Sequence, residues 1–365
     1  MPVLSNFAEE ASNLRHPNSK LPLLTVIALL LLAPSTPAQT PALASLPEAD
    51  LLIYVSPQRI LNEAAPRVVE PAELTKMRAG FAELKKAIGV EPSSIEYLVI
   101  ALRFHKPAND LSFVAPDVMT VIGGDFSADS LMTMGQLYLQ DKIRVEKYGS
   151  KSIAVMKVDP IAAEAEKNPI LKPFVEMAAV PLTANSLAFG NLRYIKSAVD
   201  AADGNGRISP AVLQSLMREP NALIAASGAP LAAFVKSFGL LGLENTSRES
   251  RCETAFGNFY AAVTMTGTGF SLRGAMNADN PDTAKIIYNL FSGLMQQGIS
   301  AVPDKDAQKI LQSLKMSARD NEIIWEADIP EKDVAELLRP KPAKAEPPKP
   351  ATTPRKAPIR RKRTR

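Results

Sequence analysis

Cysteine and histidine are the scarcest of the residues that carry chemistry in this sequence of 365 residues. It has one cysteine, Cys252, and two histidines, His16 and His105. A single cysteine cannot close a disulfide within the chain, so packing alone must stabilise the fold. Zinc sites draw on several histidine or thiolate ligands, and these counts exclude such sites. We therefore expect neither a metal nor another cofactor.

Long apolar runs are scarce as well. The longest, Leu21–Ala33, spans 13 residues, which is short of the roughly 20 that a membrane-spanning helix needs. A basic residue precedes the run and the small residues Ser35–Ala38 follow it, which is the order of a secretory signal peptide. We therefore predict that residues 1–38 are a signal peptide and that the mature chain, without a transmembrane span, is periplasmic or secreted. The alternative, a buried core helix, is disfavoured by Pro34 and Pro37 directly after the run.

Charge is divided unequally along the chain. The whole sequence has 42 Lys and Arg against 38 Asp and Glu, a net charge of +4. Residues 339–365 hold 11 of the basic residues and one acidic residue, Glu346, which gives this segment +10. The remainder, residues 1–338, has 31 basic and 37 acidic residues and therefore carries −6. The body is thus mildly acidic, and the basic isoelectric point comes from the C-terminal end.

Residues 339–365 combine these charges with seven prolines and several alanines. Such a composition buries little apolar area, so we predict a disordered basic tail. We expect it to bind an anionic envelope surface (phospholipid, lipopolysaccharide or acidic polymer), because each Lys or Arg near an anionic membrane contributes about 1 kcal/mol. Specific nucleic-acid binding is not expected in an exported protein, and a solubilising spacer is the alternative interpretation. The candidate binding residues are Arg355, Lys356, Arg360, Arg361, Lys362, Arg363 and Arg365.

A faint internal repeat organises the sequence between these ends. Gly124–Ser130 is similar to Gly274–Asn280, and each copy follows an apolar strand and begins an amphipathic helix. Short hairpin connections separate the predicted strands, which indicates antiparallel pairing because parallel strands need long crossovers. We expect strands at 51–55, 95–104, 118–122, 143–147, 152–158, 186–189, 222–226, 259–265, 270–276, 314–318 and 322–327.

Apolar residues at spacings of three and four predict the helices. A helix capped by Asn280 is expected to start at Pro281 and to end at Gly298. Short helices should also begin near Pro160 and Pro330, since proline suits the first turn. A further helix has one apolar face, formed by Leu74, Met77, Phe81, Leu84 and Ile88.

These elements place the chain in the α+β class. We predict two duplicated units of antiparallel sheet, each with amphipathic helices packed on one face, followed by the disordered C-terminal tail. The two sheets can fuse into one, each unit covering the other's edge. The expected divisions are a signal peptide at 1–38, a linker at 39–48, a first unit at 49–204, a linker at 205–220, a second unit at 221–338 and the basic tail at 339–365.

Few residues point to catalysis or ligand chemistry. His105 lies in a polar loop after a predicted strand, where a surface histidine is the simplest interpretation, and any Ser-His-Asp or Cys-His site would have to use it. We interpret Cys252 as a plain unpaired thiol. Asp203–Ile208 resembles the middle of a calcium-binding loop, but the flanking positions lack required oxygen ligands, so we interpret it as a turn. We expect Trp325 in the core rather than on a surface platform for a ligand.

The sequence therefore favours an exported bacterial envelope protein of unknown function that is not an enzyme. We expect a structural or interaction module whose body binds a protein or a small apolar ligand and whose tail binds anionic surfaces. The competing hypothesis is a hydrolase-type enzyme with an Asp- or Glu-based site between the two units, which would need no histidine. A pocket lined by two carboxylates with displaced titration would favour the enzyme, and a body without such a pocket would favour the binding module.

Overall fold

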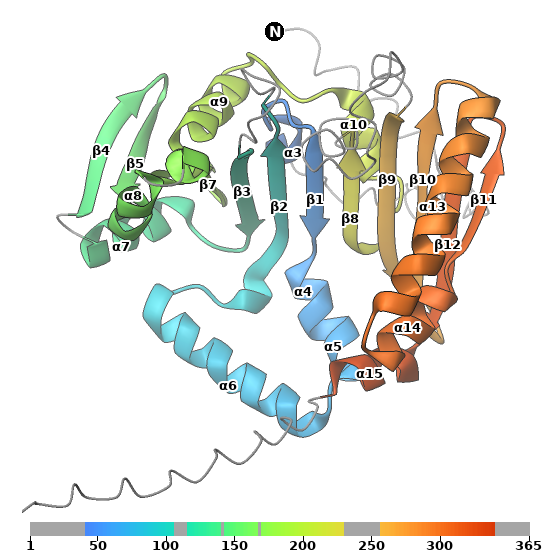
Figure 1. The fold of residues 1–365 in the computed structure, drawn as a ribbon. Coiled ribbons are helices and arrows are strands. Elements are labelled where there is room, and N and C mark those ends of the chain that lie inside the picture. The colour runs from blue at the N-terminus through green and yellow to red at the C-terminus, as the bar shows by residue number, and fades with distance from the viewer. Residues whose placement is uncertain (1–40, 106–114, 140–141, 167–168, 230–255, 340–365) are drawn as a thin grey trace, which may run out of the picture.

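One antiparallel β-sheet runs through the folded body (Figure 1). The computed structural model describes residues 41–105, 115–139, 142–166, 169–229 and 256–339. Within these residues the sheet is 12-stranded, in the order β11-β12-β10-β9-β8-β1-β2-β3-β7-β6-β5-β4. Helices pack against it, so the predicted α+β class with an antiparallel sheet is confirmed.

The strands are rich in Val, Ile and other residues that favour extended backbone. The first half of the sheet consists of β1 (Leu51–Val55), β2 (Ile95–Arg103), β3 (Asp117–Gly124), β4 (Ile143–Tyr148), β5 (Lys151–Lys157), β6 (Glu176–Thr183) and β7 (Ser186–Asn191). The second half consists of β8 (Ala222–Gly228), β9 (Phe256–Met265), β10 (Gly269–Ala278), β11 (Lys315–Arg319) and β12 (Glu322–Pro330).

β1 and β8 join the two halves as antiparallel neighbours. Leu51 lies opposite Gly228, and Val55 lies opposite Ile224. This pairing confirms that the two sheets fuse into one. It also covers the unpaired strand edge that each half would otherwise expose.

Proline sets the start of many helices, because its fixed φ suits the first turn and its missing N–H is not needed there. Pro57, Pro71, Pro210 and Pro281 each occupy such a position. The helices are α3 (Pro41–Ala44), α4 (Pro57–Arg59), η1 (Ile60–Ala64), α5 (Ala65–Val68), α6 (Pro71–Ile88), η2 (Pro92–Ser94), α7 (Ala128–Leu139), α8 (Asp159–Ala165), η4 (Pro169–Phe174), α9 (Leu192–Ala202), α10 (Pro210–Leu216), α13 (Pro281–Ala301), α14 (Lys305–Gln312) and α15 (Glu331–Leu338).

The main core lies on one face of the central strands. There α3, α9 and α10 contribute buried residues such as Leu43, Ile195 and Leu216, which pack against Val99 of β2 and Val121 of β3. Burial alternates along β2 and β3, because successive side chains of a strand point to opposite faces. The core is therefore concentrated where α9 covers the first half of the sheet.

α13 covers the opposite face, over the second half of the sheet. Its Ile287 packs against Met276 and Ile323, and Trp325 joins this cluster. Gly274 leaves room for the indole, since a Cβ atom at Gly274 would lie 2.1 Å from Nε1 of Trp325. Trp325 is therefore a packed residue, as the sequence suggests.

Both segments expected as linkers, 39–48 and 205–220, are packed parts of the fold where the structure describes them. Leu46 is fully buried, and the backbone N–H of Ile208 donates to its carbonyl over 2.9 Å. The N–H of Glu48 donates to the carbonyl of Gly206 over 3.0 Å. The two segments thus pair with each other, and α10 forms within the second. Reading them as linkers was wrong, because their polar and proline-rich composition hid a few well-placed leucines.

Two further expectations need correction. No strand was expected between residues 158 and 186, but β6 forms there and pairs with β7, with an irregularity in register between Pro181 and Thr183. Proline removes a ladder N–H and weakens the strand signal in the sequence. Gly298 does not end α13, which continues to Ala301. The helix ends before Pro303 instead, since a residue that precedes proline is biased away from helical backbone.

Candidate functional site

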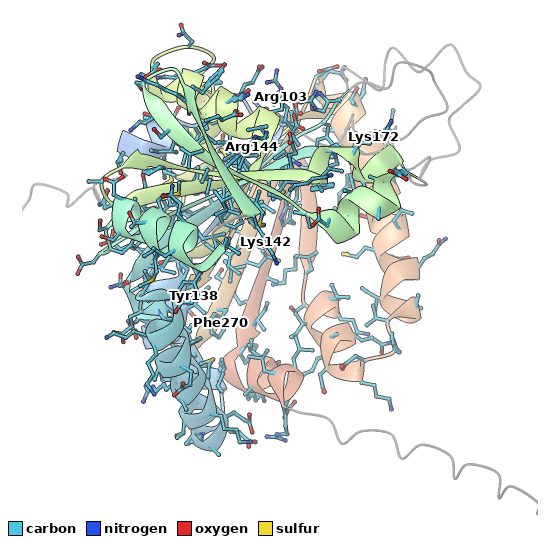
Figure 2. All side chains as sticks on the ribbon, turned by 90° about the vertical axis from the view of Figure 1, so that its left-hand side faces the viewer. Arg103, Tyr138, Lys142, Arg144, Lys172 and Phe270 are labelled. Carbon is cyan, nitrogen blue, oxygen red and sulfur yellow. The ribbon has the colours of Figure 1, made fainter. Side chains whose placement is uncertain are left out.

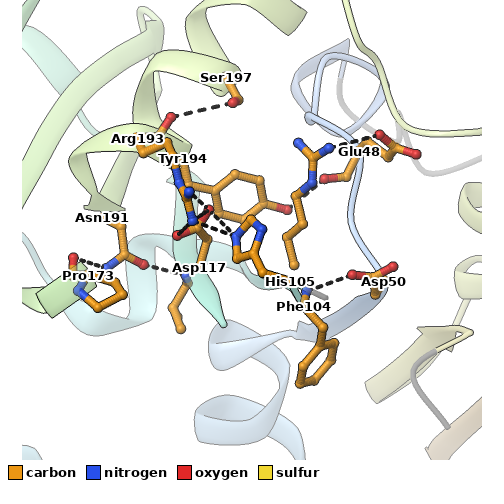
Figure 3. Close-up of polar contacts among 12 residues, drawn as sticks. Glu48, Asp50, Phe104, His105, Asp117, Pro173, Asn191, Arg193, Tyr194 and Ser197 are labelled. Atoms are coloured by element: carbon orange, nitrogen blue, oxygen red, sulfur yellow. Dashed lines mark hydrogen bonds and ion pairs between the residues drawn. The ribbon is translucent and has the colours of Figure 1, made fainter. Parts of the chain in front are cut away.

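A buried carboxylate, Asp117, is the centre of the most connected polar cluster that the structure describes (Figure 3). Asp117 begins β3, and its side chain is only 4% exposed. Arg193, the second residue of α9, donates to it through Nε (3.0 Å) and Nη2 (2.9 Å). His105, just beyond the end of β2, places Nε2 2.8 Å from Oδ2 of Asp117. The cluster therefore ties the ends of β2 and β3 to the start of α9.

His105 Nε2 also lies 2.6 Å from Nη2 of Arg193. A guanidinium only donates hydrogen bonds, so this contact requires an Nε2 that accepts. The contact with Asp117 instead requires an Nε2 that carries a proton. The tautomer with its proton on Nδ1 therefore accepts from Arg193 at Nε2, and an Nε2 that carries the proton donates to Asp117.

Asn191 and Tyr194 support this cluster from the same side. The Oδ1 atom of Asn191 accepts from the N–H of Val118 over 2.5 Å, and its Nδ2 donates to the carbonyl of Pro173 over 2.5 Å. Tyr194 donates from its hydroxyl to the carbonyl of Glu48 over 2.9 Å. Burial raises the pKa of Tyr194 well above its usual range, so this phenol remains a neutral donor.

An open groove of about 1010 Å³ lies beside the cluster, between α9 and the segment from η4 to β6. Pro173, Val175 and Leu192 contribute apolar surface to it. Charged groups line it as well, among them Lys172 at the end of η4 (Figure 2). The groove is therefore part apolar and part charged, and all of its lining residues come from the first half of the sheet and its helices.

The charged groups around this groove contact one another. The hydroxyl of Tyr148 donates to Oδ2 of Asp200 over 3.2 Å, which raises the pKa of Tyr148. Lys196 lies 2.8 Å from Oε1 of Glu146, and its ammonium lies 5.3 Å from the centre of the Tyr148 ring. These contacts hold the outer face of α9 against β4.

Glu176, another carboxylate of the groove, is paired with β4 in the same way. Arg144 donates from Nη1 to Oε1 of Glu176 over 2.8 Å, and this bond raises the pKa of Arg144. Figure 2 shows Arg144 and Lys172 on the side of the molecule that faces its viewer. Glu176, Asp200 and Asp117 are the three carboxylates that line the groove, and each of them has a partner.

The candidate residues from the sequence lie in different environments, and some of them lie outside the described residues. His105 is partly buried and paired, so its interpretation as a plain surface histidine was wrong. Asp203–Ile208 forms a turn after α9, and no group of three or more His, Cys, Asp or Glu that could hold a metal occurs among residues with described positions. Cys252 and the seven tail residues from Arg355 to Arg365 lie outside the described residues.

Sequence reasoning missed Asp117 and Arg193. They are 76 residues apart, and His105 and Arg193 are 88 apart. No local motif joins them, so a contact at this range follows only from the strand order. The signal that was available is Asp117 itself, an acidic residue at the start of an apolar strand.

The fold and the cluster define an α+β protein with one large antiparallel sheet. No helix in the described ranges is both long and apolar enough to cross a membrane. Neither a family model nor a curated protein matches the chain.

Among solved structures, the fold is similar to TP0453. Crystal form III of TP0453 has a TM-score of 0.44 and 11% identity, over 82% of this chain and 98% of that one. Crystal form I has a TM-score of 0.41 and 12% identity, over 82% of this chain and 96% of that one. Crystal form IV has a TM-score of 0.40 and 9% identity, over 83% of this chain and 98% of that one.

Proposed function

We propose that this chain is an exported, non-enzymatic protein of the bacterial envelope. Its body binds a protein or a small apolar ligand, and its basic tail binds an anionic surface. The observation that carries this proposal is the mutual pairing of the charged groups around the groove. A general base or nucleophile must be able to reach a substrate, whereas Asp117, Glu176 and Asp200 are each engaged by a neighbouring side chain.

The boundary between the two halves, where β1 pairs with β8, also favours a binding protein rather than a hydrolase. Glu48 and Asp50 are acidic residues beside β1, and both are engaged. Oε2 of Glu48 lies 3.3 Å from Nη2 of Arg103. Oδ2 of Asp50 accepts from the backbone N–H of Phe104 over 2.7 Å. These carboxylates fix the ends of strands, which is a structural role.

Because the carboxylates around the groove are each paired with a neighbouring side chain, its apolar part is the surface that remains for binding a ligand. Val175 and Leu192 are partly exposed there. Ligand sites are commonly concave and apolar with a few polar groups that fix orientation. A small apolar ligand or the apolar side chain of a protein partner has the matching chemistry.

We also infer that the two halves derive from one duplicated unit. From this boundary outward, the second half has the order β8-β9-β10-β12-β11, and the first half has β1-β2-β3-β7-β6-β5-β4. The two orders correspond once β6 and β7 are treated as an insertion. This supports the internal repeat suggested by Gly124–Ser130 and Gly274–Asn280.

A bulky substitution in the groove tests the role of the body. Ser197 lines the groove on α9, so Ser197→Trp should block it and reduce binding of the neutral apolar dye N-phenyl-1-naphthylamine by about tenfold or more. Ser300→Trp on α13 is the matched control, since both serine hydroxyls donate to the carbonyl four residues earlier on a helix. Dye fluorescence is measured against protein concentration. Equal binding by the two variants would show that the groove is not the ligand site.

Removal of residues 339–365 tests the role of the tail. At low salt the intact protein should sediment with vesicles of anionic phosphatidylglycerol and not with neutral phosphatidylcholine, because the attraction is electrostatic. The truncated protein should lose this binding and keep its melting temperature, since a segment rich in proline and charge has little apolar area to bury. Retained binding after truncation contradicts an electrostatic role for the tail.

A further inference from the structure

The last helix that the structure describes, α15, ends in two exposed leucines, directly before the basic segment. Leu337 is 36% exposed and Leu338 is 54% exposed, both in the last turn of α15. Arg339 follows them, and its Nε lies 3.4 Å from Oε1 of Glu70, just before α6. Ten more Lys and Arg follow among residues 340–365. Two exposed apolar side chains and a strongly cationic segment are therefore adjacent in the chain.

α15 is held firmly, so the direction of its last turn is fixed. Val334 packs against the cluster of Val68 and Phe270. At its start, Glu331 pairs with Arg67 of α5. These contacts fix the helix on the body, while Leu337 and Leu338 in its last turn remain exposed.

A second ion pair holds α15 against α14. The carboxylate of Asp333 is largely buried and accepts from Nζ of Lys309 over 2.5 Å. This bond raises the pKa of Lys309, so the ammonium group of Lys309 remains charged at neutral pH. Figure 1 shows α15 at the same end of the molecule as α5 and the start of α6, with α9 and α10 at the other end.

The charge of the chain orients this end toward an anionic surface. Residues 339–365 carry +10, and residues 1–338 carry −6. An anionic surface attracts the first region and repels the second, so the body is tethered to that surface at the point where the two regions join. That point is the end of α15.

We propose that the last turn of α15 lies against an anionic lipid bilayer, with Leu337 and Leu338 inserted at the level of the headgroups. This rests on the proposed attachment through the tail and extends it to the body. The leucines favour a bilayer over an acidic polymer, because only a bilayer offers an apolar interior beneath its charged surface. Charge brings the protein to the membrane, and the two leucines give binding that salt does not screen.

Vesicle sedimentation at two salt concentrations separates these contributions. The intact protein, Leu337→Asn/Leu338→Asn and Leu137→Asn/Leu139→Asn are mixed with phosphatidylglycerol vesicles in 20 mM and in 500 mM NaCl. The second pair is a matched control, because Leu137 and Leu139 are exposed leucines at the end of α7. We expect the α15 variant to bind normally at low salt and about tenfold more weakly at high salt. The α7 variant should match the intact protein.

A fluorescent probe reports the insertion directly. Leu338→Cys in a Cys252→Ser background is labelled with an environment-sensitive dye, and its emission should shift to the blue on addition of vesicles but not of polygalacturonate, an acidic polymer. Leu137→Cys treated in the same way should show no shift. Equal binding of the α15 variant and the intact protein at both salt concentrations would overturn the inference. It would leave the tail proposal standing as long as the intact protein binds at low salt and the chain without residues 339–365 does not.

Discussion

Asp117 combines deep burial with two basic partners. A carboxylate that is 4% exposed is tolerated in a fold only when charged donors compensate the loss of hydration. Arg193 supplies this compensation with two hydrogen bonds and keeps most of its own surface in water. The pair thus differs from a fully buried ion pair, because the cation is still solvated. His105 adds a third contact that depends on its protonation state.

Replacement of Asp117 by Asn tests whether this carboxylate holds the ends of β2, β3 and α9 together. The variant keeps the shape but loses the charge that Arg193 bonds. The free energy of unfolding should fall by about 1–2 kcal/mol, measured by urea denaturation. Glu176→Gln is the matched control. Because its partner Arg144 is half exposed, it should change stability by less than about 0.5 kcal/mol. Equal effects from the two substitutions would mean that the Asp117 cluster has no special structural role.

Most strands were predictable at the level of elements because their patterns are local. In β9, Phe259 to Met265 alternate in polarity, and Gly267 marks the turn before β10. Asn280 caps α13 as expected, accepting from the N–H of Thr283 over 2.9 Å. These features depend on neighbouring residues only. The helix predicted from the spacing of apolar residues between Leu74 and Ile88 is found within α6 for the same reason.

The elements that were missed depend on distant partners. The segments before α10 and before β1 have weak local signals, yet they pair across the chain at Ile208 and Leu46. The strand β6 contains Pro181 and is stabilised by its two neighbours in the sheet. The polar cluster depends on this same long-range order, because the strand order brings Asp117 and Arg193 together. Sequence patterns do not encode such contacts in any local form.

Truncation tests the structural role of residues 41–48. Removal of residues 1–40 should leave the melting temperature unchanged, because residues 1–38 are the predicted signal peptide, which the mature protein lacks. Removal of residues 1–48 should lower it by several degrees, because it deletes Leu43 and Leu46, which are 4% and 0% exposed. If the longer truncation fails to fold, Leu46→Ala should lower the free energy of unfolding by about 2–5 kcal/mol. An unchanged melting temperature in the longer truncation, or an unchanged unfolding free energy in Leu46→Ala, would show that this segment is a linker after all.

Positive and negative charge are concentrated on different parts of the chain. A mildly acidic body carries a cationic C-terminal segment at one end and, on its first half, a groove whose carboxylates are paired. An acidic body lowers non-specific attraction to anionic surfaces, so binding concentrates at the segment that carries the positive charge. This division of charge fits a protein that is held at a surface by its tail while its body is free to bind a partner. In the proposed function, the chain performs both roles outside the cytoplasm.

Fractionation of the native host with mass spectrometry of the recovered chain tests this account most directly. The account predicts a chain that lacks residues 1–38, recovered in the extracytoplasmic fraction and bound to membranes at low salt. Recovery of the intact chain from Met1 in the cytosol would contradict it.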